Sequence, residues 1–174
     1  MVVFQRPETG FFYSFTLGHP TRSGSGFFTA PHENFSGARS VFSLPSWTRM
    51  GSLFWSRINL QSDVGFVSTS PYGVFIDTTL PDTLMPITDF RGIAQAGAWV
   101  RSYRGMTGIQ QNVWIFRANA MTSALQNKIL TNPDGAPSAG GDSGAALVHI
   151  QGSNVSVLGT RRGRAVYIST NGIM

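Results

Sequence analysis

The sequence predicts an all-β protein made of short strands packed as a sandwich or a barrel. Stretches rich in Val, Ile, Phe, Tyr, Trp and Thr recur at intervals of about ten residues, and turn-forming residues separate them. The 20 glycines and 9 prolines among the 174 residues favour many turns and few long helices. A chain of this length suits one domain, or two small halves that share one fold.

The apolar runs define the expected strands in order. In the first half we expect strands at residues 11–17, 27–30, 41–44, 52–55, 64–67 and 73–76. In the second half we expect them at residues 98–103, 112–116, 146–150, 155–159 and 165–169. The proline-containing stretch 81–96 has no strand pattern and is predicted to cross between the halves. Residues 121–130 have the composition of a short helix, but the all-β context favours a strand and a loop there.

The composition indicates a globular chain with an unusual charge balance. Apolar residues make up 41% of the sequence and charged residues only 12%, about half the usual share. The net charge of +5 comes almost entirely from arginine, since Lys128 is the single lysine. The arginines are scattered and form no basic run interleaved with aromatics, so we do not expect nucleic acid as a partner.

Other features bear on compartment and chemistry. The chain has no cysteine, which excludes a disulfide framework and a zinc–thiolate site. No apolar run reaches the ~18 residues of a spanning helix, so we expect no membrane partner. Residues 1–10 carry charges and Pro7 where a signal peptide needs an apolar core. These features favour a cytoplasmic location, which includes an infected host cell, over secretion. Excision from a larger precursor stays open.

The most informative stretch is Gly-Gly-Asp-Ser-Gly-Ala at residues 140–145, directly before an expected strand. The glycines around Ser143 let the backbone bend sharply and approach a ligand closely. The serine hydroxyl can then project outward, and the N–H groups of Gly141 and Ser143 can point together at a developing oxyanion. The alternative is an ordinary Asp-Ser-Gly turn between strands. A histidine and a carboxylate at suitable positions upstream would favour a catalytic serine over an ordinary turn.

His32 is the candidate general base. It follows the apolar stretch 26–31 and would therefore stand at the end of a rigid strand, as a base aimed at a nucleophile must. The other two histidines are expected to be structural: His19 sits in a Gly-His-Pro turn, and His149 lies within a strand where we expect it to face solvent.

A catalytic histidine also needs a carboxylate on its second ring nitrogen to fix the tautomer. Asp63 is the candidate, because it stands at the beginning of the expected strand 64–67. Asp142 is too close to Ser143 to act in this way. Three further carboxylates compete on composition alone: Asp77, Asp82 and Asp89.

These motifs resemble the trypsin-like serine proteases, most closely the bacterial group of streptogrisins and α-lytic protease. That group carries Gly-Phe-x-Thr-Ala-Gly-His, and residues 26–32 are Gly-Phe-Phe-Thr-Ala-Pro-His. Its aspartate motif is similar to residues 62–67, its second-barrel hairpin to residues 97–108, and its Gly-Asp-Ser-Gly-Gly to residues 141–145. Viral proteases of the same fold also place alanine at the last of these positions. The chain order histidine, aspartate, serine is the same.

The resemblance implies a fold and its division along the chain. It implies a single trypsin-like domain, residues 1–174, built from two six-stranded antiparallel β-barrels with the active site between them. The first barrel would cover about residues 10–85 and the second residues 90–174.

The resemblance also implies a reaction, which is hydrolysis of peptide bonds through an acyl-enzyme by a serine endopeptidase. Ser143 would attack, His32 would carry the proton, Asp63 would orient the imidazole, and the amides of Gly141 and Ser143 would form the oxyanion hole. The substrate would be a peptide or protein, and neither a cofactor nor a metal would be required.

Several residues depart from the family pattern. Glu33 stands where a disulfide-bonded cysteine is usual, and Pro31 replaces a small residue and removes a backbone donor. At the strand edge that pairs with the substrate backbone, residues 160–164, Thr-Arg-Arg-Gly-Arg, stand in place of the family's Ser-Gly-Gly. Arg162 would occupy the place of a serine that usually helps hold the aspartate. The substrate-binding residues that the resemblance implies are Thr160, Arg161, Arg162 and Gly163.

Arg161 would fall in the wall of the specificity pocket, at a position where relatives that cut after glutamate have a histidine. A guanidinium there would suit an acidic or polar substrate residue, because its fork of donors matches a carboxylate. The alternative is that Arg161 and Arg164 turn outward to solvent on an edge strand.

Two alternatives remain open at the level of sequence. In a rival alignment, residues 71–80 are the strand that leads to the catalytic histidine, and Leu80 replaces that histidine. The second alternative is an inactive trypsin-like fold used as a structural or binding module, such as a viral capsid-associated or surface protein. The missing cysteines, the missing signal peptide and the arginine-rich edge permit it.

Overall fold

The computed structural model describes residues 2–6, 10–14, 26–43, 47–60, 62–69, 79–80, 82–103, 110–121, 127–132 and 142–170. Strands account for most of these residues, and no α-helix occurs within them. The described part of the chain accordingly holds no helix that could span a membrane.

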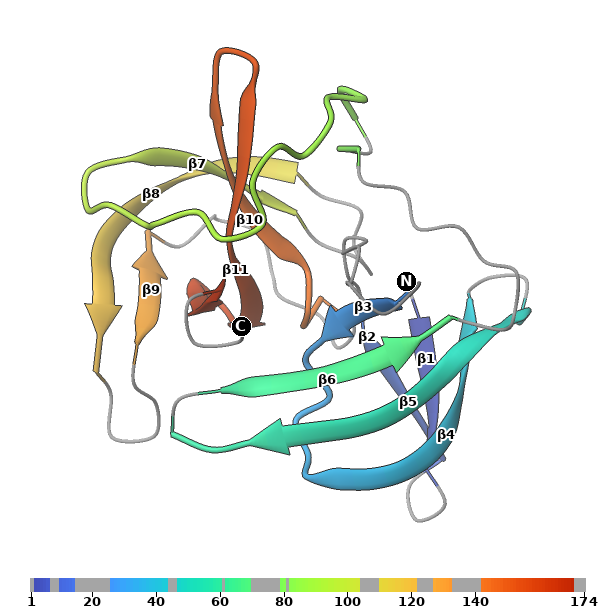
Figure 1. The fold of residues 1–174 in the computed structure, drawn as a ribbon. Helices are drawn as coiled ribbons and strands as arrows, with labels where there is room; N and C mark the ends of the chain where they lie inside the picture. The colour runs from blue at the N-terminus through green and yellow to red at the C-terminus, as the bar shows by residue number, and fades with distance from the viewer. Residues whose placement is uncertain are drawn as a thin grey trace.

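Within the described ranges, twelve strands form two groups that follow each other along the chain. Figure 1 shows these groups as the two halves of the molecule. The first group is β1 (Val2–Arg6), β2 (Gly10–Ser14), β3 (Gly26–Thr29), β4 (Phe35–Ser43), β5 (Arg49–Ile58) and β6 (Asp63–Ser68). The second group is β7 (Trp99–Tyr103), β8 (Gln110–Ala120), β9 (Lys128–Thr131), β10 (Ala146–Gln151), β11 (Asn154–Gly163) and β12 (Val166–Ser169).

The second group closes into a barrel in the order β10-β11-β12-β9-β8-β7, with all ladders antiparallel. The first group forms a six-stranded antiparallel sheet in the order β2-β1-β4-β5-β6-β3. Its edge strands β2 and β3 share no ladder within the described residues. The all-β class expected from the sequence is confirmed. The predicted second barrel is closed, whereas the first half, predicted to be a barrel as well, is a six-stranded sheet within the described residues.

Most expected strands are present, and several are longer than predicted. Strand β11 continues beyond residue 159 to Gly163, because Arg161 still pairs with Tyr167 of β12. Residues 128–130 form a strand, as the all-β context favours. Strand β1 has no counterpart among the predicted strands. The predicted strand 73–76 lies outside the described residues.

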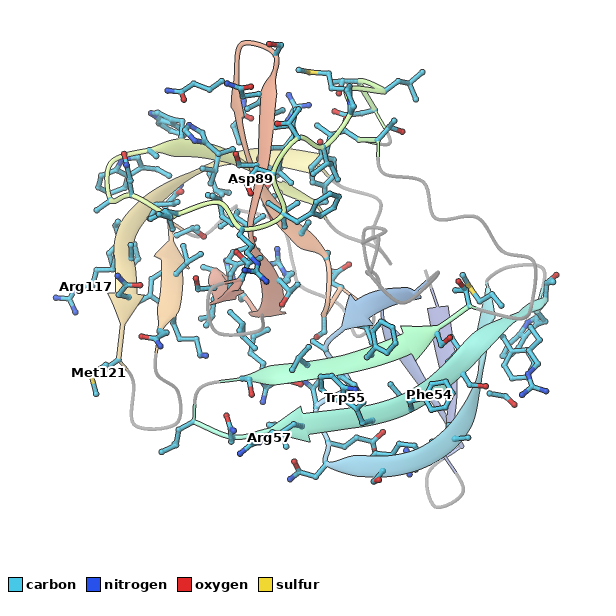
Figure 2. The ribbon with its side chains drawn as sticks, in the orientation of Figure 1. Phe54, Trp55, Arg57, Asp89, Arg117 and Met121 are labelled. Atoms are coloured by element: carbon cyan, nitrogen blue, oxygen red, sulfur yellow. The ribbon has the colours of Figure 1, made fainter. Side chains whose placement is uncertain are left out.

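The connection between the halves packs against the barrel, in agreement with the irregular crossing predicted for residues 81–96. Its described residues form no strand and are held by backbone bonds to β11: Thr88 N donates to Val155 O, and Gly92 N donates to Val157 O. Asp89 lies beside the β10–β11 hairpin (Figure 2), where Val157 N donates to its carbonyl. The connection thereby covers the outer wall of the barrel.

Apolar side chains fill both sides of that wall. One cluster lies inside the barrel and consists of Val100, Val113, Ile115, Ile129, Leu147, Leu158 and Tyr167. A second lies beneath the connection and consists of Leu80, Ile87, Tyr103, Ala146, Val148, Val155 and Val157. Each large apolar side chain buried in this way contributes about 1.5–3 kcal/mol of transfer free energy. The barrel wall is thus fixed from both faces.

Gly159 tests how closely β11 and β12 approach each other. A Cβ at this position would lie 2.4 Å from the carbonyl oxygen of Ile168, which is backbone and cannot turn aside. We expect Gly159→Ala to lower the free energy of unfolding by about 1–3 kcal/mol, the usual cost of overpacking. Urea denaturation measures it. Gly163→Ala is the matched control, since no atom lies within 4 Å of its added Cβ; equal losses in both variants would contradict the close approach.

Candidate active site

His32 stands at the turn that follows β3. Pro31 is buried and precedes it, and His32 itself has φ of 59°, a left-handed conformation that is uncommon for a residue with a side chain. The His32 backbone N–H donates to Asp63 Oδ1 at 2.9 Å. This bond anchors the turn, so the ring leaves the backbone in a direction fixed by the neighbouring strand.

Asp63 is the first residue of β6 and is fully buried. The turn before it is closed locally: Asn59 Oδ1 accepts from Ser62 N at 2.8 Å and from Ser62 Oγ at 3.0 Å. The second carboxylate oxygen of Asp63 contacts His32 Nδ1 as an ion pair or a short hydrogen bond. One carboxylate therefore holds both the backbone and the ring of His32.

Ser143 comes from the opposite half, in the turn before β10. Gly144 N donates to Arg161 O at 2.8 Å, and Arg161 N donates to Ala145 O at 2.7 Å, so the turn is fastened to β11. Ser143 Oγ lies 2.7 Å from His32 Nε2. The structure thus brings together His32, Asp63 and Ser143 in one hydrogen-bonded chain.

The competing sequence candidates have other surroundings. Asp82 bonds to the Arg101 guanidinium and to the Tyr103 hydroxyl, and Asp89 Oδ1 accepts from Arg91 N. Leu80 is buried in the core cluster beneath the connection, and His32 is the residue that meets Ser143, so the rival alignment does not match the structure. His149 is partly buried on β10. Three other residues of the prediction, namely His19, Asp77 and Gly141, lie outside the described residues.

Arg161 points into the barrel. Its side chain is fully buried, its Nη1 donates to Ser102 Oγ at 3.1 Å and to Tyr167 Oη at 3.0 Å, and it lies over the Tyr167 ring. The Ser102 and Tyr167 oxygens are themselves 2.6 Å apart. The outward alternative is therefore wrong for Arg161, whereas Arg164 is exposed. Sequence analysis missed Ser102 and Tyr167, because each looks like an ordinary strand residue.

Arg162 reaches the His32–Asp63 pair from β11. Its Nη1 lies 2.8 Å from His32 Nδ1 and its Nε lies 2.7 Å from Asp63 Oδ2. The Nε–H does not align with an acceptor, so the contact with Asp63 is an ion pair rather than a hydrogen bond. The other predicted substrate-binding residues of this edge, Thr160 and Gly163, are partly buried.

Lys128, on β9, adds a second cation near this carboxylate. It is fully buried, and the pKa of its ammonium is lowered from 10.5 to about 8. Loss of water on burial is the main cause, and repulsion by Arg162 adds to it, while Asp63 acts in the opposite direction. Its being the only lysine was the single sequence signal for this residue. No group of three or more His, Asp or Glu in the described ranges has the arrangement of a metal site.

Comparison with known proteins supplies the fold assignment. A glutamic acid specific serine protease that uses a histidine triad in substrate binding superposes with a TM-score of 0.68 over 90% of this chain and 86% of that chain, at 20% identity. The chain has the trypsin-like serine protease fold. Two further proteases of this fold agree with it. The Cellulomonas bogoriensis chymotrypsin gives a TM-score of 0.65 at 20% identity, covering 92% and 84% of the two chains.

The third comparison is with Thermobifida fusca protease A, at a TM-score of 0.67 and 19% identity, covering 97% and 88% of the two chains. No family model matches the sequence, and no curated protein matches it. The likeness of the structures therefore supports the trypsin-like fold, although only about one residue in five is identical.

The lowered pKa of Lys128 predicts a dependence of stability on pH. The folded value of about 8 lies below the ordinary 10.5, so the unfolded chain binds this proton more tightly. The contribution of Lys128 to the free energy of unfolding should therefore rise as the pH increases from about 8 to 10.5. We expect Lys128→Met to be more stable near neutral pH by about 1–3 kcal/mol and to lose this rise.

Urea denaturation at several pH values measures the effect. Arg117→Met is the matched control, because Arg117 is exposed and points away from the barrel (Figure 2). If Lys128→Met kept the same rise in stability as the wild type, the ammonium would not be the group that titrates.

Proposed function

We propose that the protein is a serine endopeptidase that cleaves peptide or protein substrates through an acyl-enzyme. The observation that carries the proposal is His32, whose ring lies between a fully buried carboxylate and the hydroxyl of Ser143. A base between an orienting acid and a hydroxyl is the arrangement that activates a serine.

The proposed reaction starts with attack of Ser143 Oγ on the substrate carbonyl carbon, while its proton passes to His32 Nε2. Asp63 stabilises the imidazolium that forms. The carbonyl oxygen becomes an oxyanion, for which the amides of Gly141 and Ser143 are the proposed donors. The imidazolium then gives its proton to the leaving amine as the C–N bond breaks. Water hydrolyses the acyl-enzyme by the same steps and restores Ser143.

The second candidate is a binding or structural module that keeps the fold without the reaction. Arg162 favours it, because a guanidinium against His32 Nδ1 competes with Asp63 for that nitrogen. The two candidates differ in whether Ser143 reacts with a fluorophosphonate, which phosphonylates activated serines with loss of fluoride and leaves ordinary ones untouched.

We expect a fluorophosphonate to label the wild type at Ser143 and to leave Ser143→Ala and His32→Ala unlabelled. Asp63→Asn should react more slowly by on the order of 10⁴, since the amide favours the wrong tautomer of His32. In turnover of a peptide substrate, the double variant of Ser143 and His32 should lose little more activity than either single variant, because the residues act as a unit.

Intact mass and peptide mapping measure the labelling. Ser36→Ala is the matched control, since Ser36 is exposed on β4, and it should be labelled like the wild type. A wild type that resists the probe would favour the binding module, and normal labelling of Asp63→Asn would mean that another group orients the histidine.

We further propose that the enzyme prefers an acidic or polar residue on the acyl side of the cut bond. Arg161 supports this, because a buried guanidinium fixed by Ser102 and Tyr167 keeps its fork of donors in one direction. Its backbone is bonded to the turn of Ser143, so Arg161 starts from a strand position beside the proposed nucleophile. The glutamic acid specific protease of similar fold uses histidines for substrate binding.

A peptide library tests the preference. We expect cleavage after glutamate to lose on the order of 10- to 100-fold in kcat/KM in Arg161→Met, the worth of one charged hydrogen-bonding pair. Arg164→Met is the control, because Arg164 is exposed near the same strand. Cleavage after lysine, arginine or large aromatics, with a profile unchanged in Arg161→Met, would overturn the assignment of the pocket.

A further inference from the structure

The position of Arg162 raises a question of proton placement at His32. Nδ1 of this ring has two close neighbours, the Asp63 carboxylate and Arg162 Nη1, which lies 2.8 Å away. A carboxylate can only accept a hydrogen bond, and a guanidinium can only donate one. Nδ1 carries either a proton or a lone pair. With a proton it donates to Asp63 but sets its N–H against the Arg162 N–H, and with a lone pair it accepts from Arg162 but sets the lone pair against the carboxylate.

The choice at Nδ1 decides what Nε2 can do. With the proton on Nδ1, the ring donates to Asp63, and Nε2 offers its lone pair to the Ser143 hydroxyl, which lies 2.7 Å away. With the proton on Nε2, Nδ1 accepts from Arg162, and Nε2 has no lone pair to receive the serine proton. Asp63 therefore favours the reactive tautomer of His32, and Arg162 favours the unreactive one.

Arg162 also acts on the charged form of the ring. A proton on both nitrogens satisfies Asp63 but sets an N–H of the imidazolium against the guanidinium, at a distance where like charges repel. The proposed reaction passes through this imidazolium. The same guanidinium thus opposes both the starting tautomer and the intermediate that the reaction needs.

Arg162 Nε lies 2.7 Å from Asp63 Oδ2, but three features weaken its binding there. Its buried Nε–H has no aligned acceptor, and its side chain keeps 28% of its surface exposed. The ammonium of Lys128 also repels it, as the lowered pKa of that lysine records. Asp63 does not depend on Arg162 for a partner, because the His32 backbone N–H donates to its other oxygen.

We propose that Arg162 is a positioning residue that competes with Asp63 for His32 Nδ1, raises the share of the tautomer with its proton on Nε2, and so restrains the reactivity of Ser143. The proposal rests on the proposed function for its effect on rate. Its effect on the position of the proton does not depend on catalysis, and the two are measured separately.

The position of the proton is measured by ¹⁵N NMR of histidine-labelled protein at mildly alkaline pH, with the signals of His32 identified by their loss in His32→Gln. We expect the wild type to show a larger share of protonated Nε2 than Arg162→Met and Arg162→Gln, in which the proton should shift toward Nδ1. Methionine keeps the length of the stem, and glutamine keeps a neutral donor. Arg164→Met is the control and should match the wild type. The same ratio of the two tautomers in the wild type and both neutral variants would overturn the proposal.

The rate of labelling by a fluorophosphonate gives the second readout. Arg162→Met should react faster than the wild type by on the order of tenfold, which corresponds to about 1.4 kcal/mol. Thermal unfolding confirms that each variant is folded. Labelling that is unchanged or slower in both neutral variants would contradict the restraint. If no variant is labelled, the proposed function fails, and the NMR spectra still decide where the proton lies.

Discussion

The candidate site depends on one buried carboxylate. Asp63 has no exposed surface, and an ionised carboxylate without partners is very costly in such a place. Its partners come from both halves of the chain: the backbone and ring of His32 from the first, and Arg162 from the second. The carboxylate thereby fixes the left-handed turn at His32 and ties β6 to β11. With the His32–Asp63 pair in place, the His32 ring points toward Ser143.

The closed barrel supplies the opposite wall of the site. The turn of Ser143 is fastened to β11 through Gly144 and Ala145, and β11 is held against β12 at Gly159, where only hydrogen fits beside the neighbouring carbonyl. Arg161 is turned inward by Tyr167 and its neighbours, so the next residue, Arg162, faces the first half. The two adjacent arginines thus point to different places, one inside the barrel and one at the histidine, where the register of β11 and β12 shifts.

The local strand pattern was sufficient to predict an all-β class, and the resemblance of the motifs singled out His32, Asp63 and Ser143. The residues alone left three other carboxylates open, namely Asp77, Asp82 and Asp89. The sequence could not foresee the contacts that cross between strands. Lys128 and Tyr167 reach the site through the ladders β9–β12 and β11–β12, which no local pattern reveals. For the same reason the open choice between an inward and an outward Arg161 required the burial of the finished barrel.

The central claim is that Ser143 is a nucleophile activated by His32. Trapping the acyl-enzyme tests it most directly: the protein is mixed with an activated ester of a short peptide, quenched in acid within the first turnover, and weighed intact and after digestion. The account predicts one added acyl group on the peptide that contains Ser143, absent when His32 is replaced by alanine. No adduct, or an adduct of equal yield on other serines, would contradict it.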